Sequence, residues 1–89
     1  MAKAFIKLPV GLVGADGPAL MECEGATLGQ ALDDCVRREP RLYSRIFRED
    51  GGVWVGIFVN GRNARQLGGM DTELADGDEI KLMPPISGG

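Results

Sequence analysis

The chain has 89 residues, of which 44% are hydrophobic and 26% are charged, and its formal net charge is -3 at pH 7. This length fits one small domain with a single core, and the composition is ordinary for a globular protein. The negative charge argues against general nucleic-acid binding, because phosphate contacts need a surplus of Lys and Arg. The chain has no histidine and two cysteines, which excludes the usual zinc-ligand sets and any histidine-based triad or general base.

The distribution of apolar residues bears on localisation. No apolar run approaches the length of a membrane span, and Lys3 and Lys7 interrupt the first residues too early for a secretory signal. We therefore expect a cytoplasmic protein that binds neither membranes nor nucleic acids.

The first half of the chain predicts a hairpin followed by a helix. Apolar residues predict a strand at 4–10, a turn-rich segment follows at 11–17, and a second strand is expected at 19–24. Thr27 is placed as the N-cap of an amphipathic helix that ends near Pro40. The apolar stripe of this helix recurs at helical spacing in Leu28, Ala31, Leu32, Cys35 and Val36.

The second half predicts three more strands. A short helical turn is expected at 42–47, within an irregular segment, before the strongest strand signal of the chain at 53–59. Asn60-Gly61 is the dipeptide most typical of a tight hairpin turn. A short strand is predicted at 62–67 and the last strand at 79–83. The resulting order is β-β-α-β-β-β.

Two hairpins that flank a single helix predict an α+β fold of the β-grasp, ubiquitin-like kind, with a mixed sheet packed on one main helix. We assign residues 1–83 to this domain and 84–89 to an extended C-terminal tail. Strand alternation predicts inward-facing positions at Ile6, Leu8, Val53, Val55, Ile57, Val59, Ile80 and Leu82. The same alternation places Phe5, Phe58 and Met83 on the outer face, where exposed apolar residues beside the tail predict a docking face for a partner. The alternative is that the irregular segment covers some of them.

The chain ends in Ile86-Ser87-Gly88-Gly89 after Pro84-Pro85. Proline holds the stem extended and outside a central strand ladder, whereas two glycines without Cβ atoms leave a narrow and flexible tip. This pattern predicts an arm that inserts into a partner's active site and presents the Gly89 carboxylate as the reacting group. The inserted segment is then Pro84, Pro85, Ile86, Ser87 and Gly88. A frayed terminus is the alternative.

Two other sets of residues have simpler interpretations than catalysis. Cys35 lies on the apolar helix stripe and Cys23 on an alternating strand, which favours small core residues over persulfide carriers. Asp76, Asp78 and Glu79 flank a glycine and are expected to shape a turn rather than an acid–base or metal cluster.

A local basic cluster stands out in the otherwise acidic chain, at Arg37, Arg38, Arg41, Arg45 and Arg48. We expect these arginines to be solvated or to pair with neighbours such as Asp33, Asp34 and Glu49, and contact with a partner is the alternative.

From Ile57 to the end, the sequence resembles the ThiS/MoaD family of ubiquitin-like sulfur carrier proteins. The motifs that carry the resemblance, in the family's order and spacing, are Val59-Asn60, Leu74-Ala-Asp-Gly-Asp78 and Pro84-Pro85-Ile-Ser-Gly-Gly89. The long stretch at 40–54 is similar to the branch that contains the cysteine-biosynthesis sulfur carrier and the small archaeal modifiers.

The resemblance implies a chemistry and a set of partners. An E1-like adenylating enzyme of the ThiF/MoeB type would activate the Gly89 carboxylate, which a sulfur donor (sulfide, a sulfurtransferase or a cysteine desulfurase) would convert to a thiocarboxylate. A downstream synthase would accept the sulfur for cysteine, molybdopterin, thiamin thiazole or a related metabolite. The chain lacks a P-loop, so ATP and Mg would belong to the activating enzyme, and the chain would bind no cofactor or metal of its own. It would be a protein co-substrate and not an enzyme.

Two alternatives remain open. A ubiquitin-like modifier would use the same tail to form isopeptide bonds through Gly89, and a noncovalent β-grasp module or an enzyme's small subunit would bind through its sheet. The sequence also leaves open the sulfur-accepting pathway, the oligomeric state, and whether a JAMM-type protease trims or recycles the tail.

Overall fold

The structure is a computed structural model, and it describes residues 1–84. These residues form five strands and several helices. The strands are β1 (Ala2–Lys7), β2 (Leu20–Gly25), β3 (Gly56–Val59), β4 (Arg62–Asn63) and β5 (Asp78–Met83). The α-helices are α1 (Val10–Val13), α2 (Leu28–Arg38) and α3 (Tyr43–Ile46). Three single-turn 3-10 helices complete the order, namely η1 (Pro40–Leu42), η2 (Ala64–Gln66) and η3 (Gly69–Asp71).

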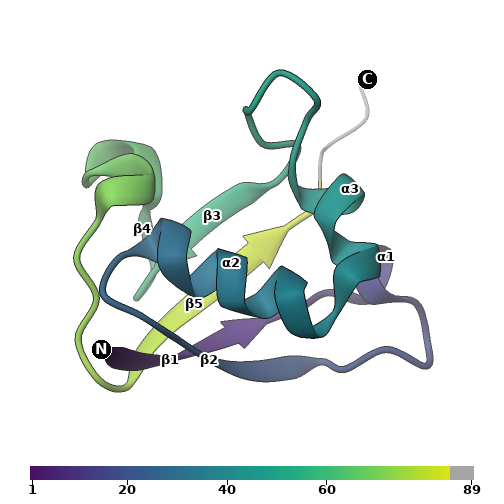
Figure 1. Ribbon diagram of the computed structural model, residues 1–89, viewed down its shortest axis with the longest axis horizontal. Helices are drawn as coiled ribbons and strands as arrows, with labels where there is room; N and C mark the ends of the chain where they lie inside the picture. The colour runs from purple at the N-terminus through teal and green to yellow at the C-terminus, as the bar shows by residue number, and fades with distance from the viewer. Residues whose placement is uncertain (85–89) are drawn as a thin grey trace.

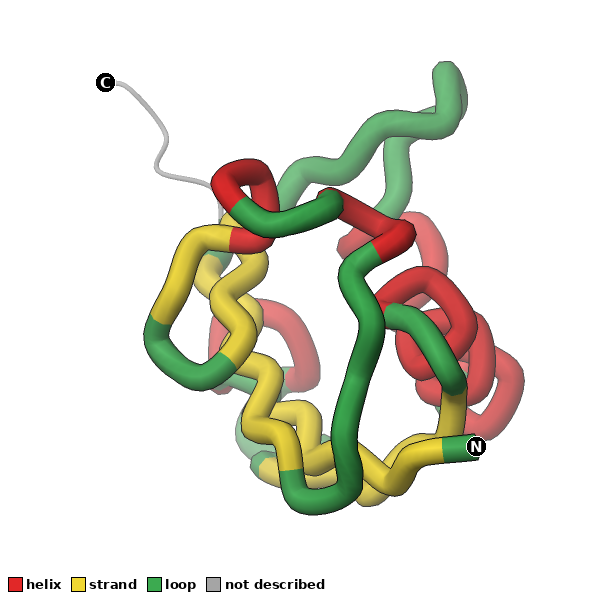
Figure 2. The backbone as a smooth tube through the Cα atoms, turned by 90° about the vertical axis from the view of Figure 1, so that its left-hand side faces the viewer, coloured by secondary structure: helices red, strands yellow, loops and turns green. Residues whose placement is uncertain are grey.

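The strands form one mixed sheet in the order β2-β1-β5-β3-β4. β1 pairs antiparallel with β2 and parallel with β5, and β3 pairs antiparallel with both β5 and β4. The main helix α2 crosses one face of this sheet (Figure 1), and in Figure 2 its coil lies to one side of the strands. This is the β-grasp arrangement that the order of predicted elements indicated.

Local hydrogen bonds fix where α2 begins. The Thr27 hydroxyl accepts a hydrogen bond from the Gln30 amide at 3.3 Å, and the Gln30 side chain accepts one from the Ala26 amide at 2.8 Å. This reciprocal pattern is a variant of the capping box. Arg37 and Arg38 occupy the last turn, where a positive charge complements the helix dipole. Within residues 1–84, no helix has both the length and the apolar character needed to cross a membrane.

The core lies between α2 and the sheet. The helix contributes four side chains with no solvent exposure, Leu28, Ala31, Leu32 and Cys35. The sheet contributes Ala4, Ile6, Cys23, Ile57, Val59, Ile80 and Leu82, all nearly or fully buried. Leu8, Leu12, Val13, Leu42, Ile46 and Val55 close the end of the core beyond β1 and β5. The strand alternation therefore predicted the buried face correctly, with the exception of Val53, which is only half-buried.

The first strand differs from its predicted range of 4–10, because the ladder covers only Ala2–Lys7. Proline has no N–H to donate, and Pro9 ends the pairing. The following residues form the helical turn α1 (Val10–Val13) instead of extended chain, and the last two of them turn into the core.

The third strand begins later than its predicted start at residue 53. Val53 forms an isolated bridge with Phe47, and the Trp54 amide donates to the Ile46 carbonyl at 2.8 Å. These bonds hold the segment against α3, so that the main sheet begins only at Gly56.

The strand predicted at 62–67 is also shorter, because pairing covers only Arg62–Asn63. The Asn63 side chain accepts a hydrogen bond from the Arg65 amide at 2.9 Å and caps η2. This local bond replaces further pairing with β3.

Side chains of α2 protect the outer edge of β2. The Asp34 carboxylate accepts a hydrogen bond from the Glu24 amide at 2.9 Å, and the Arg38 guanidinium donates to the Glu22 carbonyl. Both backbone groups would otherwise be free to pair with another strand. The hydrogen bond from Glu24 lowers the pKa of Asp34 below its usual range, and Arg37 and Arg38 lower it further.

The lowered pKa of Asp34 predicts a defined acid sensitivity. Because the folded pKa lies below the ordinary value of 3.8, the carboxylate stabilises the fold above that pH, and the contribution is lost as pH falls through the folded value. We expect Asp34→Asn to be less stable than wild type at neutral pH, with the difference shrinking under acid. Urea unfolding across this range measures it, with the exposed Asp33→Asn as the matched control. A difference that does not depend on pH would contradict the assignment.

The alternation of β5 gives a second prediction. Leu82→Ala removes a side chain that is 1% exposed and should destabilise the fold by about 2–5 kcal/mol. Met83→Ala, on the neighbouring outward position, should cost much less. Equal losses in chemical denaturation would mean that the register of β5 is wrong.

Candidate functional site at the end of the central strand

The C-terminal tail leaves the sheet from its central strand. β5 is hydrogen-bonded on both sides, and its last residue, Met83, pairs with Gly56 of β3. The next residue, Pro84, lies against α1, since a Cβ placed on Gly11 would be 3.7 Å from the Pro84 Cβ. Proline at this position does not continue the ladder. The direction in which the chain leaves is therefore fixed by the middle of the sheet and not by a free edge.

The β3–β4 turn is tied to the start of β5. Asn60 and Gly61 both have positive φ, 51° and 82°, as a tight hairpin turn of this sequence requires. The side-chain nitrogen of Asn60 (Nδ2) donates to the Asp78 carboxylate at 2.9 Å, and the side-chain oxygen of Asn60 (Oδ1) accepts from the backbone amide of Glu79 at 2.9 Å. The second Asp78 oxygen accepts from the Ala75 amide at 2.8 Å. Asn60 and Asp78 thus fix the start of β5 relative to β3.

The turn before β5 is also tied to β1. The Lys3 amide donates to the Asp76 carboxylate at 2.9 Å, and the Lys3 carbonyl accepts from the Gly77 amide at 2.8 Å. Gly77 has a φ of 87°, which favours glycine. These carboxylates shape the turn, as predicted, and residues 1–84 contain no cluster of His, Cys, Asp or Glu suited to hold a metal.

The bonds of Asn60 can be tested separately from its backbone conformation. Asn60→Gly keeps the turn, because glycine tolerates positive φ, but removes both side-chain bonds to β5. We expect a loss of about 1–2 kcal/mol in urea unfolding. Asn60→Asp should cost at least as much, because it loses the donor and places a second carboxylate beside Asp78. Wild-type stability of Asn60→Gly would show that the turn alone is sufficient.

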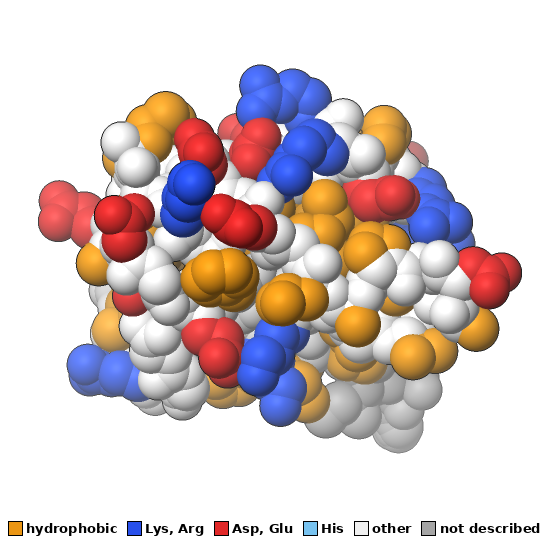
Figure 3. Space-filling view, turned by 90° about the horizontal axis from the view of Figure 1, so that it is seen from below, with side chains coloured by type: hydrophobic (Ala, Val, Ile, Leu, Met, Phe, Trp, Pro, Cys, Tyr) orange, Lys and Arg blue, Asp and Glu red, His pale blue; other side chains and the backbone are white. Residues whose placement is uncertain are grey.

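The outer sheet face carries the three residues of the predicted docking face. Phe5 is 38% exposed and Met83 is 42% exposed, whereas Phe58 is half-buried. Phe5 on β1 pairs with Glu79 of β5, and Phe58 on β3 pairs with Lys81 of β5. Charged side chains of the central strand therefore lie between the two aromatic residues. Figure 3 shows the β1–β2 side of the molecule, where acidic and basic side chains are interspersed with hydrophobic ones.

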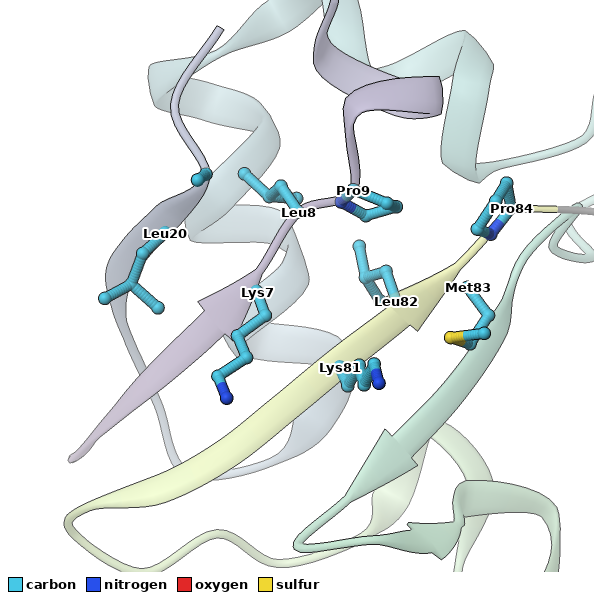
Figure 4. A pocket seen from close by; sticks show the side chains of 9 residues that line it. Lys7, Leu8, Pro9, Leu20, Lys81, Leu82, Met83 and Pro84 are labelled. Atoms are coloured by element: carbon cyan, nitrogen blue, oxygen red, sulfur yellow. The ribbon is translucent and has the colours of Figure 1, made fainter.

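Met83 lines an open groove beside the point where the chain leaves β5, at Met83 and Pro84, which we call the root of the tail. The groove measures about 540 Å³ and is lined by Lys7, Leu8, Pro9, Ala19, Leu20, Lys81, Leu82, Met83 and Pro84 (Figure 4). Leu20 is 52% exposed on the outer face. Lys7 pairs with Glu79 at 3.0 Å, whereas Lys81 forms no ion pair within residues 1–84. Leu20 was not among the predicted docking residues, although its position opposite the outward-facing Lys7 was the available signal.

The two cysteines are buried, as predicted. Cys35 donates to the Met21 sulfur at 3.6 Å, and Arg38 donates to the Cys23 sulfur at 3.1 Å. The hydrogen bond to Cys23, followed by burial, raises the pKa of Cys35. The hydrogen bond from Cys35 lowers the pKa of Cys23, with help from Arg38 and against the effect of burial. Neither thiol reaches solvent.

Most of the basic cluster is neutralised locally. Four of its five arginines form ion pairs, Arg37 and Arg38 with Asp34, Arg41 with Glu39, and Arg48 with Asp50. Asp34 was a predicted partner, whereas Glu39 and Asp50 take the place of Asp33 and Glu49. Arg45 instead donates to the backbone carbonyl of Leu12.

The reactive end of the predicted tail lies outside the described residues. Of the segment predicted to insert into a partner, the structure describes Pro84. Pro85, Ile86, Ser87, Gly88 and Gly89 are the remaining predicted positions.

The mixed sheet, the single main helix and the central last strand place the chain in the ubiquitin-like class of β-grasp proteins. The model of the ThiS family matches residues 12–89, and the chain belongs to this family. A putative sulfur carrier protein of Archaeoglobus fulgidus is 30% identical over 86 residues, covering 94% of this chain and 96% of the relative.

Two solved structures extend the similarity. Small archaeal modifier protein 1 from Methanosarcina acetivorans superposes with a TM-score of 0.86 at 33% identity, covering 100% of this chain and 98% of that one. A chain in the crystal structure of the BexX/CysO complex of Amycolatopsis orientalis matches with a TM-score of 0.82 at 27% identity, covering 97% of this chain and 99% of that chain. Sulfur carriers and small modifiers thus both occur among the proteins that this chain resembles.

Proposed function

We propose that this protein is a sulfur carrier whose Gly89 carboxylate is adenylated and then converted to a thiocarboxylate. The observation that carries the proposal is the exit of the chain from the central strand at Pro84, five residues before Gly89. Membership of the ThiS family supports the same chemistry. A chain that leaves from the centre of a sheet gives the partner a fixed starting point from which to take up the tail.

The reaction needs activation, because a carboxylate is a poor electrophile. An oxygen of the Gly89 carboxylate attacks the α-phosphorus of ATP, pyrophosphate leaves, and an acyl-adenylate forms. Sulfide then attacks the acyl carbon and displaces AMP, which leaves a thiocarboxylate. If the donor is a persulfide, the first product is an acyl disulfide, and a second thiol must reduce it. ATP and Mg are bound by an E1-like enzyme of the ThiF/MoeB type.

This chain supplies the substrate and the docking surface. Gly88 and Gly89 lack Cβ atoms and fit a narrow channel, and the stem from Pro84 to Ser87 leads into it. The activating enzyme docks on the outer face at Phe5, Phe58 and Met83, and the groove beside Met83 accepts one of its apolar side chains. Lys81, at the rim of this groove, favours an acidic residue on that enzyme.

The BexX/CysO complex supports the expectation that such a carrier works through partner enzymes. For this chain we propose a sulfur donor, a downstream sulfur-accepting synthase and a cytoplasmic location, with the chain acting as co-substrate and not as an enzyme. A JAMM-type protease is the partner expected if the tail is trimmed or recycled.

A second function is favoured by the similarity to small archaeal modifier protein 1. Attack of a lysine amine on the same acyl-adenylate, directly or after transfer to a partner thiol, would give an isopeptide bond at Gly89. The two functions share activation and differ in the nucleophile. Lysine-linked conjugates that depend on Gly89 would identify the modifier.

The first step can be tested by intact mass spectrometry. After incubation with its activating enzyme, ATP, Mg and sulfide, the protein should gain the mass difference of one oxygen replaced by one sulfur. A Gly89-deleted variant should keep the wild-type melting temperature and show no gain. An unchanged mass for the wild type, with an enzyme that is active on another carrier, would contradict the proposal.

A further inference from the structure

A hairpin projects from the body of the molecule at the end where β5 finishes. It spans residues 47–54 and forms the teal loop at the top of Figure 1 and the green loop at the upper right of Figure 2. Phe47 and Val53 form a bridge at its base, and the Arg48 amide donates to the Gly52 carbonyl at 2.8 Å. The Trp54 amide bonds to Ile46, which is fully buried. We call this segment the 47–54 hairpin, and its base is anchored in the core.

The 47–54 hairpin presents aromatic side chains to solvent. Trp54, the only tryptophan of the chain, is 50% exposed, and Tyr43, whose ring centre lies 5.4 Å from that of Phe47, is 58% exposed. The Arg48 guanidinium lies 5.0 Å from the centre of the Trp54 ring, and Asp50 pairs with Arg48 at 3.3 Å. These contacts hold the indole in place before any partner arrives, which lowers the entropy cost of binding.

A hollow beside the indole can accept a side chain. It measures about 410 Å³ and is lined by Ser44, Phe47, Arg48, Glu49, Asp50 and Trp54. Two aromatic rings line the apolar part and charged groups line the rest. Tryptophan, tyrosine and arginine are the residue types most enriched at the interface positions that contribute most to binding energy.

The charges on the 47–54 hairpin are largely paired. Arg48 pairs with Asp50 at 3.3 Å, and Glu49 is the remaining charged residue of the segment. Arg45, in α3 just before the hairpin, bonds to the Leu12 carbonyl and forms no ion pair within residues 1–84, so its charge is not neutralised there. This arginine favours an acidic residue on the partner.

The 47–54 hairpin lies next to the root of the tail. Trp54 is two residues before Gly56, which pairs with Met83, the last residue of β5. The groove of the docking face lies at the same end of β5. A partner that takes the tail at this end can therefore contact both surfaces at once.

We propose that the 47–54 hairpin is a second docking surface for the enzyme that activates Gly89, which places an apolar side chain beside Trp54 and an acidic side chain near Arg45. This inference rests on the proposed function. The enzyme then holds the carrier on both sides of the tail root, which orients the tail and limits rotation of the carrier about its stem.

The single tryptophan permits a direct test. Protein labelled with 5-fluorotryptophan gives one fluorine resonance, which should shift or broaden when the unlabelled activating enzyme is added. The Gly89-deleted variant should respond in the same way, because docking does not require the reaction. An unchanged resonance in the presence of enzyme that converts the wild type would overturn the proposal. A shift caused by an RNA oligonucleotide, without one caused by the enzyme, would also overturn it.

Kinetics of thiocarboxylate formation give the second readout. Trp54→Ala should raise KM for the carrier by about tenfold with kcat little changed, and Arg48→Ala should act in the same direction. Arg65→Ala, on η2, is the matched control and should behave like wild type. Circular dichroism confirms that each variant is folded. Failure of the wild type to react would count against the proposed function, whereas equal KM values for wild type, Trp54→Ala and Arg48→Ala would overturn this inference alone.

Discussion

The central position of β5 is the constraint on which the rest of the structure depends. A last strand at an edge could fray and carry the chain end with it, but β5 is hydrogen-bonded to β1 on one side and to β3 on the other. Two of its side chains, Ile80 and Leu82, are almost fully buried. The chain therefore leaves the sheet, at Pro84, from one of the most constrained points of the molecule.

Several of the residues that carry the family resemblance hold β5 in its central position. Asn60 and Asp78 bind each other across the start of β5, and Asp76 binds the backbone of β1. All three act near the start of β5, whereas the chain leaves the sheet at the other end of this strand, after Met83. Their role is to place β5, and through β5 the point at which the chain leaves the sheet. The residues that position β5 are therefore distinct from the C-terminal glycines that we propose to carry the chemistry.

The sequence predicted the parts of the fold that local rules determine. The Asn60-Gly61 turn, the Thr27 cap and the apolar stripe of α2 each depend on residues close in sequence, and each was correct. The predicted start of β3 was wrong because the Trp54 amide bonds to the Ile46 carbonyl, and the alternation of apolar residues along a strand gives no sign of such a contact. The groove was missed for a similar reason, since Leu20 and Met83 lie on strands that are distant in sequence. The roles of Gly88 and Gly89 rest on the resemblance, because these residues lie outside the described part of the chain.

The central claim is that the protein carries sulfur on its own C-terminus, and the most direct measurement is the chemical state of that end in the cell. The protein should be isolated from its native cells under mild conditions and treated with an electron-deficient sulfonyl azide, which converts a thiocarboxylate to an N-acylsulfonamide and leaves a carboxylate unchanged. The account predicts a labelled C-terminal peptide ending at Gly89, absent when the activating enzyme is deleted. A terminus found only as carboxylate or in lysine-linked conjugates, under growth conditions that require sulfur transfer, would contradict it.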